Sequence, residues 1–483
     1  MASRSAEQPN LLFVLTDDQG AWAMGCAGNS EIRSPNLDRL AAEGIRFDNF
    51  FCASPVCSPA RASILTGRIP SQHGVHDFLH WQADSGAGGL NKKVPADNVQ
   101  FLAGQPTYAE ILGRAGYDTC LSGKWHLGDG LEPRSGFQTW NPMPYGASEY
   151  FKAPVVENGE LVTHEGDYSS DLFTDNALKF LERQVGDAKP FCLNVHFTAP
   201  HAPWGRRQHP REIWNDYYDN CPFASVPGHE EPLPIGFHAQ PIDEEGRRRS
   251  LAGYFAAIQG MDRNVGRLLD WLDDNDLASN TLVVFMSDNG MNMGHHGLYG
   301  KGNATWPQNM FDTSVKVPCL IRRPGHVPEN QINTHLLSQY DWLPTLLEYV
   351  GLSAGLPNGL PGRSFAPLLT GDELQERESI YVFDEYGPVR MIRSREWKLV
   401  WRYPAGAHEL YNVIEDPGEL ANLFNRPGHR DRISSMLGDL EGWFERYVDP
   451  QLDGTKLAIT GRGQSDHATK KGAFAYRFPW LDQ

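Results

Sequence analysis

The sequence has no long apolar run and no excess of basic residues. No apolar stretch approaches the ~20 residues that cross a bilayer, so we expect no membrane-spanning helix. The 43 Lys and Arg residues stand against 60 Asp and Glu residues, which gives a formal net charge of −17. Because nucleic-acid binding depends on a basic surface, nucleic acid is not expected as a partner.

Cysteine is also sparse and shows no disulfide pattern. The seven cysteines are odd in number and form no CxxC pair, which is typical of a reducing compartment. The N-terminal segment MASRSAEQPN has no apolar signal core. The sequence therefore predicts a cytoplasmic protein, and the alternative that a leader has been removed stays open.

Aromatic residues are plentiful and exclude an intrinsically disordered chain. The 23 Phe, 17 Tyr and 13 Trp residues supply ample apolar surface. A folded chain of 483 residues buries roughly three quarters of its unfolded surface. The chain therefore needs neither disulfides nor structural metals to hold its core.

Apolar runs rich in β-branched residues alternate with helical patterns over most of the chain. Strands are predicted at residues 11–16, 45–51, 117–123, 191–197 and 282–286, and helices at residues 35–44, 107–116, 171–184, 251–274 and 341–350. This alternation predicts an α/β fold with a large mixed, mostly parallel sheet sandwiched by helices.

The pattern changes near residue 378, where a smaller α+β domain is predicted. The short runs SIYVFDE, VRMIRS and WKLVWRY indicate an antiparallel sheet, and residues 433–447 form one amphipathic helix. We therefore divide the chain into a large α/β domain at residues 9–377, a subdomain at 378–449 and an arm at 450–483. The arm is expected to pack on the body or on a second subunit, which makes a homodimer one expectation.

Two predicted strands are followed directly by acidic residues. Asp17 and Asp18 follow LLFVLT, and Asp288 and Asn289 follow LVVFMS. Sites in open α/β sheets form beyond the carboxyl ends of strands, so these side chains are expected to share one crevice. Carboxylates so close repel one another unless a cation neutralises them, and ligation by oxygen alone suits Ca²⁺ or Mg²⁺ better than zinc. Strand-end turns with local hydrogen bonds are the alternative interpretation of either pair.

Cys57 begins a segment typical of a short helix. Ser58 is expected as its N-cap, Pro59 as its first helical residue and Gly67 as its stop. Cys57 then lies at the helix mouth, where the dipole favours an anion, with Arg61 one turn further on. Such a place is wrong for an inert thiol, so Cys57 is predicted to be functional; a buried structural cysteine is the alternative.

These segments resemble the type I sulfatases of the alkaline phosphatase superfamily. CSPAR matches their C-x-P-x-R motif, and the likeness runs in the same order over residues 9–425. The other similar segments are LLFVLTDDQG, LTGRIPSQHGV, SGKWHLG, FTAPHAPW, VVFMSDNG, GLYGKG, VPCLIRRPG, VRMIRSREWKLV and ELYNVIEDPGELANL. The resemblance is specific because motifs from six separated places coincide, and it implies that residues 9–377 are the catalytic domain.

The resemblance implies that Cys57 is oxidised to formylglycine by a dedicated maturing enzyme. In the family, one hydroxyl of the hydrated aldehyde binds the metal and attacks sulfur, and the other later expels sulfate. The residues carried over as calcium ligands, with residue 57 itself, are Asp17, Asp18, Asp288 and Asn289. Mg²⁺ and Mn²⁺ are alternative metals.

The resemblance also implies roles for five basic residues. Arg61 would stabilise the nucleophilic oxyanion, Lys124 would bind sulfate, and His126 would be the base that triggers its release. His201 and Lys301 would meet the leaving-group side. Cleavage of a sulfate ester places charge on the leaving and equatorial oxygens, so preorganised cations are what the reaction needs.

The implied function is arylsulfatase-type hydrolysis of small sulfate monoesters, with a formylglycine-generating or anaerobic sulfatase-maturing enzyme as partner. Two alternatives stay open: a phosphonate monoester or phosphodiester hydrolase of the same superfamily, and a non-catalytic binder of sulfated ligands. Related phosphodiesterases often have His at the position of Asn289. The net charge of −17 favours a small or modestly charged substrate, because sulfated polyanions are repelled unless the mouth is locally basic.

Overall fold

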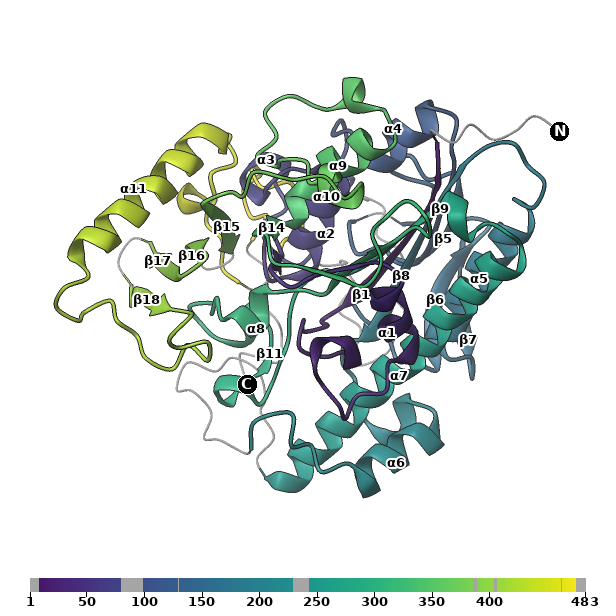
Figure 1. The fold of residues 1–483 in the computed structure, drawn as a ribbon, viewed down its shortest axis with the longest axis horizontal. Coiled ribbons are helices and arrows are strands. Elements are labelled where there is room, and N and C mark those ends of the chain that lie inside the picture. Colours follow the sequence, from purple (N-terminus) through teal and green to yellow (C-terminus); the bar gives the residue numbers. More distant parts are fainter. Residues whose placement is uncertain are drawn as a thin grey trace.

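An eight-stranded sheet forms the centre of the protein (Figure 1), whose computed structural model describes residues 8–79, 99–128, 130–228, 243–384, 389–403, 406–461 and 463–474. Its strands follow the order β13 (Gln331–Asn333), β2 (Ile45–Phe47), β12 (Cys319–Arg322), β9 (Thr281–Ser287), β1 (Asn10–Asp17), β8 (Phe191–Pro200), β4 (Asp118–Lys124) and β5 (Thr139–Met143). β12 runs antiparallel to both its neighbours, whereas the other neighbours pair in parallel. The mixed, mostly parallel sheet confirms the predicted fold class.

The side chains of β1 show why helices cover both faces of the sheet. Leu11, Phe13 and Leu15 belong to one apolar core, and Leu12 and Val14 to the other, because successive side chains of a strand point to opposite faces. The first core is covered by α2 (Cys57–Thr66), α4 (Tyr108–Arg114), α9 (Trp342–Tyr349) and α10 (Ala366–Leu369). The second is covered by α1 (Pro35–Ala42), α5 (Ser169–Glu182), α6 (Arg211–Asn220) and α7 (Glu244–Asp274), which lie on the other side in Figure 1.

Several predicted boundaries are wrong, and the long helix expected at residues 251–274 begins at Glu244. The expected strand at residues 45–51 is two strands, because β2 joins the large sheet whereas β3 (Phe50–Phe51) pairs with β14 (Leu337–Ser338). The first helix ends at Ala42, before the expected stop at Gly44. Gly44 serves a close approach instead, since a Cβ there would lie 2.2 Å from the carbonyl oxygen of Ile321.

The predicted C-terminal antiparallel sheet is present. It contains β15 (Ser379–Asp384), β16 (Val389–Ser394), β17 (Trp397–Arg402) and β18 (Glu409–Asn412), in that order. The amphipathic helix α11 (Arg430–Tyr447) packs on it through Leu440 and Phe444. In Figure 1 this unit lies to one side of the large sheet.

The described part of the C-terminal arm packs on the body of the same chain. The backbone N–H of Gly454 donates to Ser71 Oγ at 3.2 Å, and Gln464 forms a parallel β-bridge with Leu79. Residues 462 and 475–483 of the predicted arm lie outside the described residues.

Short elements connect these layers. They are α3 (Pro70–His73), α8 (Asp312–Val315), β10 (Asn292–Met293), β11 (Tyr299–Gly300) and the hairpin of β6 (Lys152–Glu157) and β7 (Glu160–Glu165). All seven cysteines are free thiols. Among the helices in the described ranges, none has the length and apolar character needed to cross a bilayer.

Candidate active site

The candidate site lies at the carboxyl ends of four neighbouring strands, β9, β1, β8 and β4. These strands are mutually parallel, so their carboxyl ends meet at one edge of the sheet. At or directly after their last residues they carry Asp17, Asp18, Lys124, His201, Asp288 and Asn289. The two acidic pairs are brought together: the backbone N–H of Asp18 donates to Oδ1 of Asp288 at 3.2 Å.

Helix α2 faces this edge and begins at Cys57 itself. The prediction that Ser58 caps the helix is wrong, because its hydroxyl serves a long-range contact. Ser58 Oγ donates to the carbonyl oxygen of His126 at 3.0 Å and accepts the backbone N–H of Leu79 at 3.1 Å. The helix ends at the predicted stop, Gly67, whose φ of 65° lies in the left-handed region that favours glycine.

Each buried carboxylate has a basic partner. The ion pairs are Lys124 with Asp17, Lys301 with Asp18, and Arg61 with Asp288. Arg61 is only 1% exposed and approaches Asp288 Oδ2 with Nε at 3.0 Å and Nη2 at 2.9 Å. Its Nη2 also lies 3.9 Å from Asp17 Oδ2. The guanidinium thus links the two strands that carry the acidic pairs.

Burial raises the pKa of each of these carboxyl groups, and the basic partners lower it. Burial raises the pKa of Asp17, but Lys124 and His201 outweigh burial and bring it below its ordinary value. Lys301 does the same for Asp18. For Asp288, burial and the neighbouring Asp17 keep the pKa above its ordinary value despite Arg61.

Cys57 lies at the centre of these charges. Its thiol donates to Asp17 Oδ1 at 3.3 Å, and Lys301 Nζ donates to Cys57 Sγ at 2.7 Å. Burial, and then Asp17, raise the pKa of Cys57 to about 12, so the unmodified thiol is protonated at neutral pH. The helix N-terminus therefore does not activate the thiol itself, because burial and then the neighbouring carboxylate of Asp17 oppose it.

The donor set fits a hard divalent cation. One ligand atom from each of Asp17, Asp18, Cys57 and His201 can be chosen so that all four lie within 4.8 Å of one another. Asn289 Oδ1 is buried and has no hydrogen-bond partner among the described residues, while its Nδ2 donates to Asp18 Oδ1 at 2.8 Å. Carboxylates with an unpartnered amide oxygen are ligands that Ca²⁺ and Mg²⁺ prefer.

Two histidines flank the cluster. His201 Nε2 lies 3.6 Å from Asp18 Oδ2 and the side chain is 23% exposed, so it lies on the open side of the site. His126 is buried, and its Nε2 lies 3.2 Å from the carbonyl oxygen of Leu79. Its Nδ1 has no hydrogen-bond partner within the described part of the chain. Burial, with Lys124 and Arg61, lowers the pKa of His126 well below its ordinary value, so the ring is neutral.

Sequence reasoning missed the buried residues that position the site from a distance. Gln339 is fully buried and its Nε2 donates to the carbonyl oxygens of Ser287 and Asp288, at 2.9 and 2.7 Å. Its Oε1 accepts the N–H of Ala53 just before α2 at 3.0 Å. No local pattern could have identified Gln339, because these partners lie at least 51 residues before it.

The fold and the site together define an enzyme-like α/β protein with a carboxylate-rich centre at one edge of its sheet. Comparison with known proteins gives its family. The model of the sulfatase family matches residues 9–352. A second model, the C-terminal region of N-sulphoglucosamine sulphohydrolase, matches residues 294–444.

Curated relatives agree with the family model. The chain is 30% identical to a choline-sulfatase of Rhizobium meliloti, over 87% of this chain and 83% of that one. It is 26% identical to an N-acetylglucosamine-6-O-sulfatase of Bacteroides thetaiotaomicron, over 92% of this chain and 88% of that one. A solved structure of a protein bound to its substrate D-glucosamine-2-N,6-O-disulfate has the same fold, with a TM-score of 0.76 at 24% identity over 93% of this chain and 99% of that one.

The chain therefore belongs to the sulfatase family, as a type I sulfatase of the alkaline phosphatase superfamily. It is a sulfuric ester hydrolase.

Proposed function

We propose that the protein hydrolyses sulfate monoesters with a formylglycine made from Cys57 and a divalent cation, Ca²⁺ before Mg²⁺ or Mn²⁺. The observation that carries this proposal is the contact of Cys57 Sγ with both Asp17 and Lys301, inside a buried cluster of opposite charges. The cation would be held by Asp17, Asp18, Asp288 and Asn289 together with residue 57. When bound, it supplies positive charge that makes a nearby hydroxyl group more acidic.

The first step transfers the sulfuryl group to residue 57. One hydroxyl oxygen of the hydrated aldehyde attacks sulfur, the bond from sulfur to the ester oxygen breaks, and the alcohol leaves with a proton. His201, which lies on the open side, and Lys301 are the candidate donors of that proton. Arg61 and Lys124 hold positive charge beside the reacting oxygens, where preorganised cations lower the barrier.

The second step releases sulfate and restores the aldehyde. His126 accepts the proton of the remaining hydroxyl group, whose electron pair forms the carbonyl bond while the bond from carbon to the sulfate oxygen breaks. Its lowered pKa and its unpartnered Nδ1 within the described residues support this role as base. Addition of one water to the aldehyde then regenerates the diol, so one water is consumed per ester.

The relatives support an organic sulfate ester as substrate. Their names specify choline sulfate in one case and N-acetylglucosamine 6-sulfate chemistry in another. We extend to this chain only what those substrates share, a sulfate monoester of an alcohol. A formylglycine-generating or anaerobic sulfatase-maturing enzyme is the partner that this chemistry requires.

A matched panel of esters tests the proposal. The protein is produced with a maturing enzyme, and mass spectrometry of the Cys57 peptide verifies the aldehyde. An aryl sulfate, an aryl phosphate and an aryl phosphonate with the same leaving group are then compared by kcat/KM, with Cys57→Ala as the control. We expect the sulfate to be preferred by at least about 100-fold, an energy difference of about 2.7 kcal/mol.

Each other outcome identifies an alternative. Preference for the phosphonate would assign a phosphonate monoester hydrolase with the same nucleophile. Binding of sulfate esters without turnover by protein that carries the aldehyde would assign a non-catalytic binder. Full activity with an intact thiol at position 57 would refute the formylglycine mechanism.

A further inference from the structure

A pocket outside the candidate active site lies where the large domain meets the C-terminal sheet. Its volume is about 690 Å³. One wall comes from residues 46–49, 312–313 and 316–319 of the large domain, and the other from residues 393, 395, 413, 414 and 417 of the C-terminal unit. We call it the basic interdomain pocket.

The lining of this pocket is positive in a protein that is strongly negative overall. It carries the basic residues Arg46, Lys316, Arg393 and Arg395 and the acidic residues Asp48 and Asp312. The whole chain, in contrast, has a formal charge of −17. A local concentration of one sign attracts ligands of the opposite sign.

The acidic residues of the pocket are already engaged. Asp48 accepts two hydrogen bonds from Arg46, at 2.6 and 3.2 Å. Asp312 pairs at 2.5 Å with Lys398, which is fully buried behind it, and lies 3.7 Å from Arg393. Both carboxylates therefore lie closer to these partners than to Lys316 and Arg395, the other cations of the pocket.

Two cations of the pocket keep donors for a ligand, and a third adds positive charge beside them. Lys316 forms no ion pair within the described residues, and its Nζ lies 5.9 Å from the centre of the Phe51 ring. Arg393 is 5% exposed and its Nε, unpartnered in the described part of the chain, is buried, so it contributes charge and not a reachable donor. Arg395 is 62% exposed and pairs with Glu376 at 3.2 Å, a surface contact of small energy.

The pocket lies at the same edge of the sheet as the candidate active site. Arg46 pairs with Leu320, and Leu320 pairs with Phe285, so residue 48 stands level with residue 287, next to Asp288. Two strand spacings separate β2 from β9, about 10 Å. Trp22, which lines the pocket, donates its indole N–H to the carbonyl oxygen of Met291 at 2.9 Å, three residues after Asp288.

We infer that the basic interdomain pocket is an oxyanion subsite that binds a second sulfate or carboxylate group of an extended substrate while its reacting sulfate lies at residue 57. This inference rests on the proposed function. Because the strand that lines the pocket, β2, lies about 10 Å from β9, the second anionic group would lie on a different unit of the substrate from the reacting ester. The substrate class is thus a chain with several anionic groups, which differs from the modestly charged substrate expected from the overall acidity.

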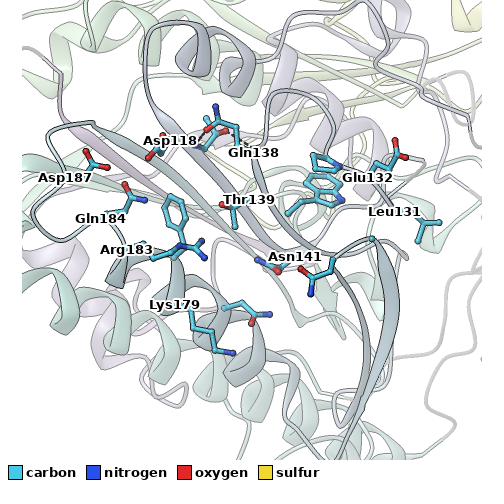
Figure 2. Close-up of a pocket in the computed structure, with 17 residues that line it drawn as sticks. Asp118, Leu131, Glu132, Gln138, Thr139, Asn141, Lys179, Arg183, Gln184 and Asp187 are labelled. Atoms are coloured by element: carbon cyan, nitrogen blue, oxygen red, sulfur yellow. Dashed lines mark hydrogen bonds between the residues drawn. The ribbon is translucent and has the colours of Figure 1, made fainter.

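A contrasting pocket supplies a matched control. It has a volume of about 790 Å³ and lies at the amino ends of β4 and β5, the edge opposite the active site (Figure 2). Its charged residues are Lys179 and Arg183 against Asp118, Glu132 and Asp187. Lys179 is exposed, so Lys179→Ala removes one positive charge without affecting the basic interdomain pocket.

The test uses two substrates with the matured protein. One is an aryl sulfate with a single anionic group, and the other is an oligosaccharide with several sulfate groups. The double variant Lys316→Ala/Arg395→Ala should lower kcat/KM for the oligosaccharide by about tenfold or more, mainly through KM, because two charge-assisted contacts are lost. It should change kcat/KM for the aryl sulfate by less than about twofold, and Lys179→Ala should change neither.

Equal losses on both substrates, or no loss on either, would overturn the subsite. Calorimetric titration of the same oligosaccharide into Cys57→Ala protein, with and without the double substitution, keeps the test independent of turnover. If the matured wild-type protein hydrolyses neither ester, the proposed function fails, and weaker binding by the double variant still supports the subsite. Weaker binding of inorganic sulfate with unchanged binding of the oligosaccharide would contradict it, since the pocket would then hold only the free ion.

Discussion

Single residues in the cluster have two functions, one in the fold and one in the chemistry. Asp288 is the clearest case, because it is a candidate ligand and also the nearest carboxylate to the buried Arg61. Asp288→Asn should therefore remove bound Ca²⁺ and lower kcat/KM at least about 100-fold. It should also lower the free energy of unfolding by about 3–5 kcal/mol, the cost of leaving a buried charge unpaired.

Metal analysis, kinetics and urea unfolding measure these three effects. Asp270→Asn is the control, because Asp270 forms only an exposed ion pair with Arg39. That variant should change stability by less than about 1 kcal/mol and leave metal content unchanged. Unaltered metal content in Asp288→Asn would contradict the assignment of Asp288 as a ligand.

Because His126 is neutral, we expect it to add no protonation step to the dependence of kcat/KM on pH at mildly acidic pH. Burial lowers its pKa well below the ordinary value, so the ring stays unprotonated as the pH falls through about 6.5. We expect kcat/KM of the matured protein to show no inflection from His126 between pH 6 and 7. An inflection near pH 6.5 that disappears in His126→Asn would refute a buried neutral base.

At the scale of single residues, the sequence predicts a role where that role depends only on the neighbouring residues in the chain. Asp17 and Asp288 could be identified because each directly follows a buried strand, and parallel strands bring their ends together. The role of Ser58 could not, because its hydroxyl is engaged by Leu79 and His126. The protonated state of Cys57 was also hidden, since it depends on Asp17, 40 residues away.

At the scale of elements, the C-terminal arm supports the N-terminus of α2. Gln464 is fully buried; its Oε1 accepts the N–H of His76 at 2.9 Å, and its Nε2 donates to the carbonyl oxygen of Gly74 at 2.8 Å. Its own N–H donates to the carbonyl oxygen of Phe78 at 2.9 Å. Leu79, which follows Phe78, bonds through its backbone to both Ser58 and His126. The arm thus positions the backbone that holds two site residues.

Gln464→Ala should lower kcat by about tenfold while the protein stays folded, because the 74–79 backbone loses two hydrogen bonds of about 1 kcal/mol each. Activity and the near-ultraviolet circular dichroism spectrum are the measurements. Ser465→Ala is the control, since its hydroxyl bonds only within the arm, to Ala473, and it should retain activity. Rescue by Gln464→Glu, which keeps an acceptor for His76, would support positioning; equal activity of Gln464→Ala and wild type would contradict it.

Element types follow from the sequence more reliably than sheet membership does. Thr107 was expected to open a helix, and its side chain accepts the N–H of Glu110 at 3.2 Å. The division of residues 45–51 between two sheets was not predictable, because the apolar pattern continues across the break. Pairing with residues 320–321 and 337–338 decides it, and those contacts span the whole domain.

At the scale of the whole molecule, buried histidines make stability depend on pH. Seven described histidines have a lowered pKa: the buried His73, His126, His196 and His209, and the half-buried His295, His296 and His408. Burial is the first cause in each case. A group with a lowered folded pKa contributes stability above its unfolded pKa and loses it as the pH falls, because only the unfolded state then binds the proton.

Buried acids with a raised pKa act in the opposite direction. Burial raises the pKa of Glu419 to about 7 and that of Asp262 to about 6, so these two offset two of the seven protons. The free energy of unfolding should then fall by at most about 7 kcal/mol per pH unit below about pH 6.5. His209→Phe should reduce that slope by about 1.4 kcal/mol per pH unit. Urea unfolding at pH 7, 6 and 5 measures it, and identical slopes for the two proteins would refute the contribution of His209.

The basic interdomain pocket belongs to this scale too, and the sequence could not reveal it. Its basic residues come from residues 46, 316, 393 and 395, and the overall charge of −17 pointed to the opposite substrate class. Only the packing of the C-terminal sheet against the large domain brings these cations together. Total charge therefore says little about the charge at a particular place on the surface.

The burial of Cys57 depends on segments that are synthesised long after Cys57 itself. Cys57 is 4% exposed, and one of its contacts, Lys301, comes 244 residues later in the chain. A ribosome that adds about 5–20 residues per second needs roughly 12–50 s to make that interval. During this period the nascent chain lacks Lys301, so the proposed maturing enzyme would meet an open segment there, which the finished molecule encloses.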